Sequence, residues 1–368
     1  FMSCDQAKSR LYYIDLLEFI AMLLVLINHC TTYSYDISES ASAAAWIRYT
    51  FRSLHSTAVP LFFFVNGYLL FNHSFSLDKH VKKTIRLIAL TVVWGFINVL
   101  MMMLIDHKPL SPKEILMTVW TWRMGWINQF WFMGVLVCIY ILFPVLKCAF
   151  DADRKIFSYF VIVCALMTFG NKLIAAVGTI AAHELLGYPE QIHENVFNMF
   201  NPFRGVYLWY AFVYFCCGGL AHLYVPDIKK QHKKLNLAAA VAIPASMLLL
   251  TAWAYYLTTL TGELWDNVWG GQDSVFAFVI VLSVFILSLN YRPQKQWFEK
   301  VVLGVSTNTL GIFFVHELFI HMILPYAKKA PIMQNIIGSI VVAAGILTIS
   351  LLTAIVIKKI PFVRKLLI

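Results

Sequence analysis

Long apolar segments alternate with short polar connections along most of the chain. A window of about 19 residues, the length of a helix that crosses the hydrocarbon core of a membrane, finds about ten such segments. Because a helix satisfies its own backbone hydrogen bonds in lipid, the pattern predicts an all-α polytopic membrane protein. The predicted spans are residues 14–33, 53–71, 87–105, 129–148, 156–178, 205–225, 237–259, 274–290, 304–324 and 335–357.

Composition agrees with this pattern. Hydrophobic residues make up 60% and charged residues 13% of the 368 positions, whereas about 25% of a soluble domain is charged. We therefore predict one integral-membrane domain over residues 1–368, in contact with membrane lipid and without an appended soluble domain. The net charge of +10 is spread over the connections rather than gathered on one surface, so we expect no nucleic-acid partner.

The distribution of basic residues predicts the orientation. With the N-terminus inside, the cytoplasmic segments hold 20 of the 29 Lys and Arg residues, as the positive-inside rule expects. Both termini are then cytoplasmic, and the longer connections lie outside. Those outer connections carry six tryptophans, which fit an interfacial belt or a platform for stacking a sugar ring. The tryptophans are Trp46, Trp120, Trp122, Trp126, Trp265 and Trp269.

Three ionisable residues lie in the first apolar segment. Asp15, Glu18 and His29 fall on one side of a helix, with Glu18 and His29 within about 20° of each other. A rise of 1.5 Å per residue separates Glu18 from His29 by roughly 16 Å, about half the hydrocarbon thickness. An ionisable residue inside a membrane is a functional candidate by default. The two residues therefore mark two depths of one polar path.

Four short stretches occur in a fixed order along the chain. They are Asp15–His29, Val59–Leu70, Phe130–Pro144 and Gly304–His316. In order and spacing they resemble the acyltransferase-3 family of integral-membrane O-acyltransferases, with its first-helix motif ending in His, its Val-Pro-Leu-Phe-Phe-x-x-Ser-Gly segment, its Trp-Phe/Tyr helix and its late Ile-x-x-His helix. Lys83–Arg86 is similar to the family's Arg-x-x-Arg pair, and Phe212–Gly219 resembles its later Phe-x-x-Gly helix.

The chain departs from the family pattern at three positions. Glu18 stands where the family has an arginine, Asn66 replaces the Ser of the Ser-Gly pair, and Lys83 replaces the first Arg of the basic pair. The change at Glu18 reverses a charge, and a glutamate cannot clamp an anionic group as an arginine does. Either another cation, with Lys82 or Arg10 as candidates, takes that role, or activity is altered or absent.

The resemblance implies transfer of an acyl group, expected to be acetyl, from cytoplasmic acetyl-CoA or another acyl-CoA to a hydroxyl. The acceptor would be a glycan or small molecule at or near the outer face. We expect a bacterial cytoplasmic (inner) membrane and a role in O-acetylation of a cell-envelope polysaccharide. A secondary transporter or glycan exporter is the rival interpretation, because transporters also carry ionisable residues near the midplane. A catalytically inactive relative is a third interpretation.

Candidate catalytic residues follow from this chemistry. His29 would be the general base on the acceptor hydroxyl, because imidazole exchanges a proton near neutral pH. Asp15 and Glu18 would hold neighbouring cations or orient the donor, although Glu18 also fits a solvated position at the cytoplasmic boundary. His316 would line the same cavity, and a hydrogen-bonded core histidine is the alternative.

Candidate donor-binding residues lie at the start of the third span. Lys82, Lys83 and Arg86 would meet the phosphates of coenzyme A, with Arg86 offering a bidentate fork. The same three residues also fit a purely topological positive-inside cluster.

Candidate acceptor-binding residues are Asn66, Trp131 and Arg204; Arg204 also fits an end-of-helix anchor. We predict no metal site. His316-Glu317 with His321 resembles the HExxH motif of metalloproteases, but the two histidines are five residues apart and so miss its spacing. His183-Glu184 and His193-Glu194 lack a further ligand at typical spacing.

Overall fold

The structure, a computed structural model, describes residues 10–38, 42–121, 126–192, 208–331, 334–361 and 363–367. Within these ranges it contains helices and no strand. Among the described residues, nine helices, some of them composite, are long and apolar enough to cross a membrane, and the shorter apolar helix Val275–Ser288 makes a tenth. The prediction of an all-α polytopic membrane protein with about ten spans is confirmed.

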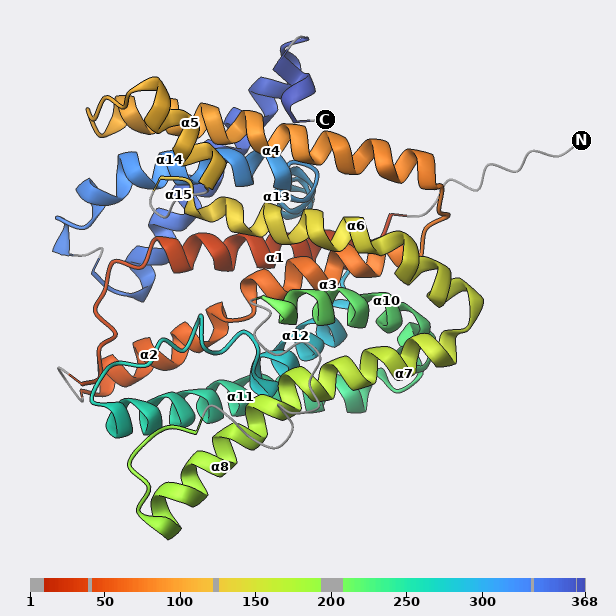
Figure 1. Ribbon diagram of the computed structural model, residues 1–368, viewed down its shortest axis with the longest axis vertical. Coiled ribbons are helices and arrows are strands. Elements are labelled where there is room, and N and C mark those ends of the chain that lie inside the picture. The colour runs from red at the N-terminus through yellow and green to blue at the C-terminus, as the bar shows by residue number, and fades with distance from the viewer. Residues whose placement is uncertain are drawn as a thin grey trace, which may run out of the picture.

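Most of the long helices lie alongside one another (Figure 1). In that view α1 and α3 run through the middle, between α4 and α6 above and α7 and α11 below. The helices before residue 187 are α1 (Tyr12–His29), α2 (Ala43–His55), α3 (Ala58–Phe71), α4 (Leu77–Ile105), α5 (Pro112–Thr121), η1 (Asn128–Phe130), α6 (Trp131–Ala152), α7 (Arg154–Ala165), η2 (Leu166–Gly170) and α8 (Asn171–Leu186). The later ones are α10 (Trp209–Lys230), α11 (His232–Thr261), α12 (Val275–Ser288), α13 (Gln296–Ser306), α14 (Thr309–Ala327), α15 (Ile336–Lys359) and η4 (Val363–Leu366).

Two predicted spans are interrupted by short breaks. The predicted span 53–71 is α2 followed by α3, with a break at Ser56 and Thr57. The predicted span 304–324 contains the end of α13, a break at Thr307 and Asn308, and most of α14. A threonine side chain makes a hydrogen bond at each break. The hydroxyls of Thr57 and Thr307 donate hydrogen bonds to backbone carbonyls of the preceding turn. Hydropathy alone cannot detect such breaks because the residues around them remain apolar.

The outer connections are also more helical than the sequence indicated. α2 begins at Ala43, inside the predicted connection 34–52, and α5 lies inside the predicted connection 106–128. α2 begins with a Ser42 side chain that accepts a hydrogen bond from the Ala45 backbone N–H. This is the usual way to satisfy a free donor at a helix N-terminus.

A close crossing of α3 and α10 forms the centre of the bundle. A Cβ atom added to Gly67 would lie 1.7 Å from the Phe215 carbonyl oxygen, and one added to Gly218 would lie 1.9 Å from the Phe64 carbonyl oxygen. Neither position has room for a side chain, and small residues at such crossings are the usual means of bringing membrane helices together. Two of the family-like motifs therefore meet at one contact.

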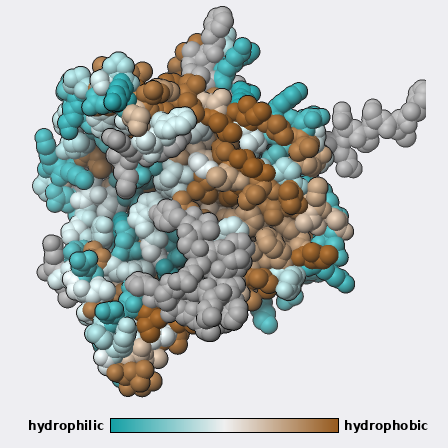
Figure 2. Space-filling view, in the orientation of Figure 1, coloured by the Kyte–Doolittle hydropathy of each residue, from teal (hydrophilic) through white to brown (hydrophobic). Residues whose placement is uncertain are grey.

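The outside of the bundle is apolar. Leu104 of α4, Val145 of α6 and Tyr159 of α7 are exposed, as lipid-facing side chains would be. In Figure 2 hydrophobic side chains form a band from the upper middle to the right of the face, whereas hydrophilic ones predominate on the left and at the margins. Such a surface is expected for a protein whose solvent is lipid.

Candidate functional site

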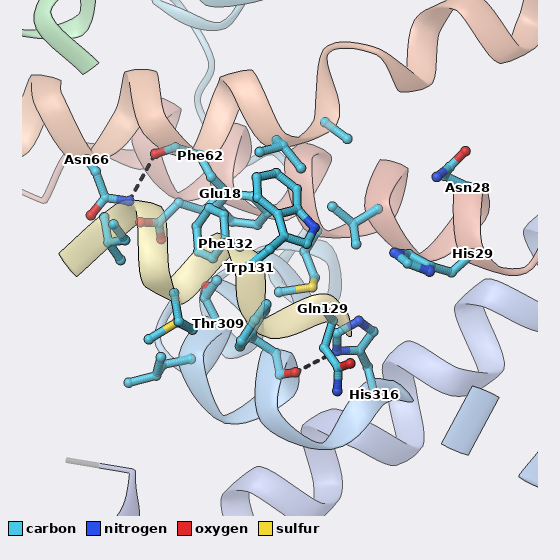
Figure 3. Close-up of a pocket in the computed structure, with 18 of the residues that line it drawn as sticks. Glu18, Asn28, His29, Phe62, Asn66, Gln129, Trp131, Phe132, Thr309 and His316 are labelled. Carbon is cyan, nitrogen blue, oxygen red and sulfur yellow. Dashed lines mark hydrogen bonds between the residues drawn. The ribbon is translucent and has the colours of Figure 1, made fainter. Parts of the chain in front are cut away.

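A cavity of about 340 Å³ lies inside the bundle, with α1, α3, α6 and α14 in its walls. Residues from the ends of α2 and α13, from α4 and from the connection between α11 and α12 complete it. Figure 3 shows side chains of these helices converging on one space. Six of the predicted site residues line the cavity together: Glu18, His29, Asn66, Lys83, Trp131 and His316.

One end of the cavity combines charged and polar side chains. The Lys83 Nζ lies 5.3 Å from the centre of the Tyr140 ring, and the Tyr140 hydroxyl donates to the Asn66 Oδ1 at 3.4 Å. The Asn66 amide in turn donates to the Phe62 carbonyl at 2.9 Å (Figure 3). Glu18 also lines this cavity and has no hydrogen bond or ion pair with any described residue. Its carboxyl group is available to a ligand.

The middle of the cavity is apolar. Phe132 of α6 contacts Phe62 of α3 and Phe313 of α14, with ring centres 6.0 and 5.5 Å apart. Met22 and Val25 of α1 line the same space. An apolar section of this kind separates the groups near Glu18 from those near His29 and favours an uncharged part of a ligand.

His29 lies beside a histidine and a glutamate of α14. Its Nδ1 is 3.7 Å from the Glu317 Oε2, and the His316 Nε2 is 3.7 Å from the same oxygen. The His29 side chain is 34% exposed, whereas that of His316 is 1% exposed. His29 is therefore the accessible member of the group.

The orientation of His316 follows from its backbone contact. Its Nδ1 lies 2.7 Å from the Phe313 carbonyl oxygen (Figure 3). A carbonyl can only accept, so Nδ1 carries a proton and donates it to this bond. Nε2 is consequently the nitrogen that faces Glu317.

Several cavity residues were missed by the sequence interpretation. His55, Gln129 and Gln272 line the cavity without having been predicted, and Trp269, predicted for an interfacial belt or a sugar-stacking platform, lines it as well. The rings of Trp131 and Trp269 lie 5.6 Å apart, so one predicted outer-connection tryptophan reaches the site. His55 comes last in α2, directly before the break, and no sequence pattern marked that position.

Glu317 was noted only as part of a rejected metalloprotease motif. Its position directly after His316 was the one available signal. The contact with His29 depends on how α1 and α14 pack, and these helices are far apart in sequence.

Asp15 does not line the cavity. It accepts two hydrogen bonds from Arg10, each at 2.8 Å, and one from the Ser306 hydroxyl. The hydrogen bond to Asp15 raises the pKa of Arg10 above its ordinary value. Asp15 thus holds a neighbouring cation, as expected, and ties α1 to the end of α13.

The basic residues of α4 divide into two groups. All three side chains are exposed, but only Lys83 also lines the cavity, and Lys82 and Arg86 do not. Arg86 donates to the Lys365 carbonyl oxygen at 3.4 Å.

Lys358 donates to the Thr307 carbonyl oxygen at 2.8 Å, and Thr307 is a cavity residue. Lys358, which the sequence indicated only as topology, therefore contacts the wall of the cavity, and the backbone at Lys365 contacts α4. Arg204 and the pair His193-Glu194 lie outside the described residues.

A family model described as an acyltransferase domain matches residues 11–358. No curated protein and no solved structure matches the chain.

Proposed function

The chain belongs to the acyltransferase-3 family, and we propose that it transfers an acyl group, acetyl in the first instance, from acyl-CoA to a hydroxyl of a glycan or small acceptor. One observation carries the proposal. A single cavity joins Lys83 and Glu18 to His29 and His316, with an apolar section between them. A donor with a charged head and a long neutral arm fits this order of groups.

The reaction needs a base next to the acceptor. A proton on the His29 Nδ1 facing Glu317 leaves the lone pair of the other ring nitrogen for the acceptor hydroxyl. As that nitrogen takes the proton, the hydroxyl oxygen bonds to the thioester carbonyl carbon and the carbon–sulfur bond breaks. Coenzyme A leaves as a thiolate and is protonated in its turn. The products are an acyl ester and free coenzyme A, and Glu317 stabilises the imidazolium formed on the way.

The donor would enter from the basic end. Lys83 and Lys358 supply positive charge there, while Lys82 and Arg86 extend it over the exposed start of α4. The phosphates of coenzyme A are the natural partners of such charges. Glu18 suits a different part of the donor, because a carboxyl oxygen accepts hydrogen bonds from the amide N–H groups of the pantetheine arm. Glu18 would therefore contact the pantetheine arm from the position where the family has an arginine.

The acceptor would bind beyond His29. Asn66, Trp131 and Arg204 were the predicted contacts. Of these, Trp131 lies beside Trp269, whereas Asn66 lies beside Tyr140 at the end of the cavity near Lys83, and Arg204 lies outside the described residues. Two aromatic rings near polar groups such as Gln272 provide a surface for the apolar face of a sugar. We propose a cell-envelope polysaccharide as the acceptor class and a bacterial inner membrane as the location, with the basic end in the cytoplasm.

Purified chain in detergent tests the proposal. Transfer of label from radiolabelled acetyl-CoA to a panel of envelope glycans is expected with the unmodified chain, and a loss of at least a hundredfold is expected with His29→Ala, because general-base catalysis contributes that order of rate. His321→Ala is the matched control, since His321 is on α14 but does not line the cavity. Full transfer by His29→Ala would remove the proposed base. Glycan flux into proteoliposomes without any acyl-CoA would favour the transporter instead.

A further inference from the structure

His29, His316 and Glu317 bring three possible metal-binding atoms close together. The His29 ring, the His316 ring and the Glu317 carboxylate each offer one atom, and all three lie within 4.8 Å of one another. They come from α1 and from consecutive positions of α14. No two of them are neighbours at the spacing of a sequence motif for metal binding.

Hydrogen bonding does not account for this group. The His316 Nδ1 is committed to the Phe313 carbonyl, so the neutral ring turns the lone pair of Nε2 toward Glu317. The Glu317 Oε2 is also an acceptor. Both atoms are buried, and neither has a hydrogen-bond partner among the described residues. Two acceptors that face each other away from water need a positive species between them.

The separations distinguish a metal ion from a shared proton. A proton shared between nitrogen and oxygen would draw these atoms to about 2.7–3.2 Å. A tetrahedral zinc ion with nitrogen and oxygen ligands at about 2.0–2.1 Å holds neighbouring ligands about 3.4 Å apart. The two observed separations of 3.7 Å are close to the second value.

The chemistry of the donors points the same way. Two histidines and one glutamate are the protein ligands of a common class of zinc site, which keeps its fourth position open. Mg²⁺ and Ca²⁺ prefer oxygen ligands, so a site with two imidazole nitrogens does not suit them. The bond from His316 to the Phe313 carbonyl is the kind of second contact that orients a metal-binding histidine.

We propose that His29, His316 and Glu317 form a binding site for Zn²⁺ or a closely similar divalent transition metal. The fourth position would face the cavity, because His29 and His316 both line it.

The site would regulate acyl transfer, an extension that rests on the proposed function. A metal on the His29 Nδ1 forces the proton of the neutral ring onto the other nitrogen, which then has no lone pair for an acceptor hydroxyl. Zn²⁺ is therefore expected to inhibit transfer by occupying the base.

Direct binding tests the site without reference to activity. Chelator-treated chain in detergent is titrated with Zn²⁺ by calorimetry and with Co²⁺ by visible absorption, which reports tetrahedral coordination. We expect one ion per chain, and affinity at least tenfold lower in His316→Ala and in Glu317→Gln. His321→Ala, on the same helix, is expected to bind like the unmodified chain. Glu317→Gln preserves shape, so it keeps the test valid if His316→Ala does not fold.

The outcomes separate the two proposals. Absence of binding, or binding that Glu317→Gln leaves unchanged, overturns the metal site. Zn²⁺ binding with no acyl transfer by any form of the chain would leave the site standing and remove the proposed function. Transfer that persists when the site is saturated with Zn²⁺ would overturn the inhibition.

Discussion

Lys82 and Lys83 are adjacent in sequence and meet different surroundings. Both are exposed, but Lys83 lines the cavity and lies over the Tyr140 ring, whereas Lys82 does not line the cavity. The positive-inside rule predicts the same role for both residues. A comparison of the two therefore distinguishes a role in binding from a role in membrane topology.

Replacement of Lys83 by Ala is expected to raise the KM for acyl-CoA about tenfold, which corresponds to loss of about 1.4 kcal/mol of binding. Lys82→Ala is expected to change the KM less than twofold. The measurement is initial-rate kinetics with acyl-CoA and, separately, with acyl-pantetheine, which lacks the nucleotide phosphates. Equal effects of Lys83→Ala on both donors would show that the residue does not contact phosphate.

Helix crossings explain what several motif residues do. Gly67 stands next to Asn66 in a family-like motif, and its absent side chain leaves room for the Phe215 backbone. Gly218 does the same for the Phe64 backbone. The motif thus serves two purposes, because its asparagine lines the cavity while its glycine holds α3 against α10.

A methyl group at this crossing is expected to destabilise the bundle. Gly67→Ala places Cβ against a backbone carbonyl that cannot move aside, so we expect a loss of about 3 kcal/mol or more from overpacking. Gly345→Ala in α15 is the control, because nothing lies within 4 Å of its added Cβ. Thermal unfolding in detergent is the measurement. A midpoint for Gly67→Ala equal to that of Gly345→Ala would contradict the close crossing.

The two helix breaks have a related consequence. The α2–α3 break follows His55, and the α13–α14 break contains Thr307. Both residues line the cavity. Non-helical backbone inside a membrane is tolerated where it is buried or lines a cavity, and these breaks occur in such places.

At the scale of the whole molecule, positively charged residues at one end of the bundle make the two ends of the cavity different. Arg10 contacts Ser306, Lys358 contacts Thr307, and Arg86 contacts the C-terminal segment. Residues near both termini therefore meet at the same end of the bundle. The positive-inside rule predicts that this end faces the cytoplasm, where acyl-CoA is made available.

Labelling of single cysteines placed at the two ends of α11 tests that orientation. Glu263→Cys follows the helix and is predicted to react with a membrane-impermeant thiol reagent in intact cells. Lys233→Cys, near its start, is predicted to react only after permeabilisation. The unmodified chain gives the background from its own cysteines. The reverse pattern would place the basic end outside and exclude cytoplasmic acyl-CoA as the donor.

The sequence by itself determined the fold class, the approximate spans and the family. These depend on local hydropathy and on motif order, which are readable along the chain because each membrane helix satisfies its backbone within its own length. It also identified Glu18, His29, Asn66, Lys83, Trp131 and His316, all of which line one cavity.

The tertiary structure alone decided which residues meet. Glu317 gained its place beside His29 through the packing of α14 near α1, and His55 and Gln272 reached the cavity through a helix break and a folded connection. Asp15, read from the same helical face as Glu18, instead pairs with Arg10 and Ser306. Such contacts join positions distant in sequence, and hydropathy or motif spacing within one segment contains no information about them. The first helix supplied the histidine, but the packing of another helix supplied its partners.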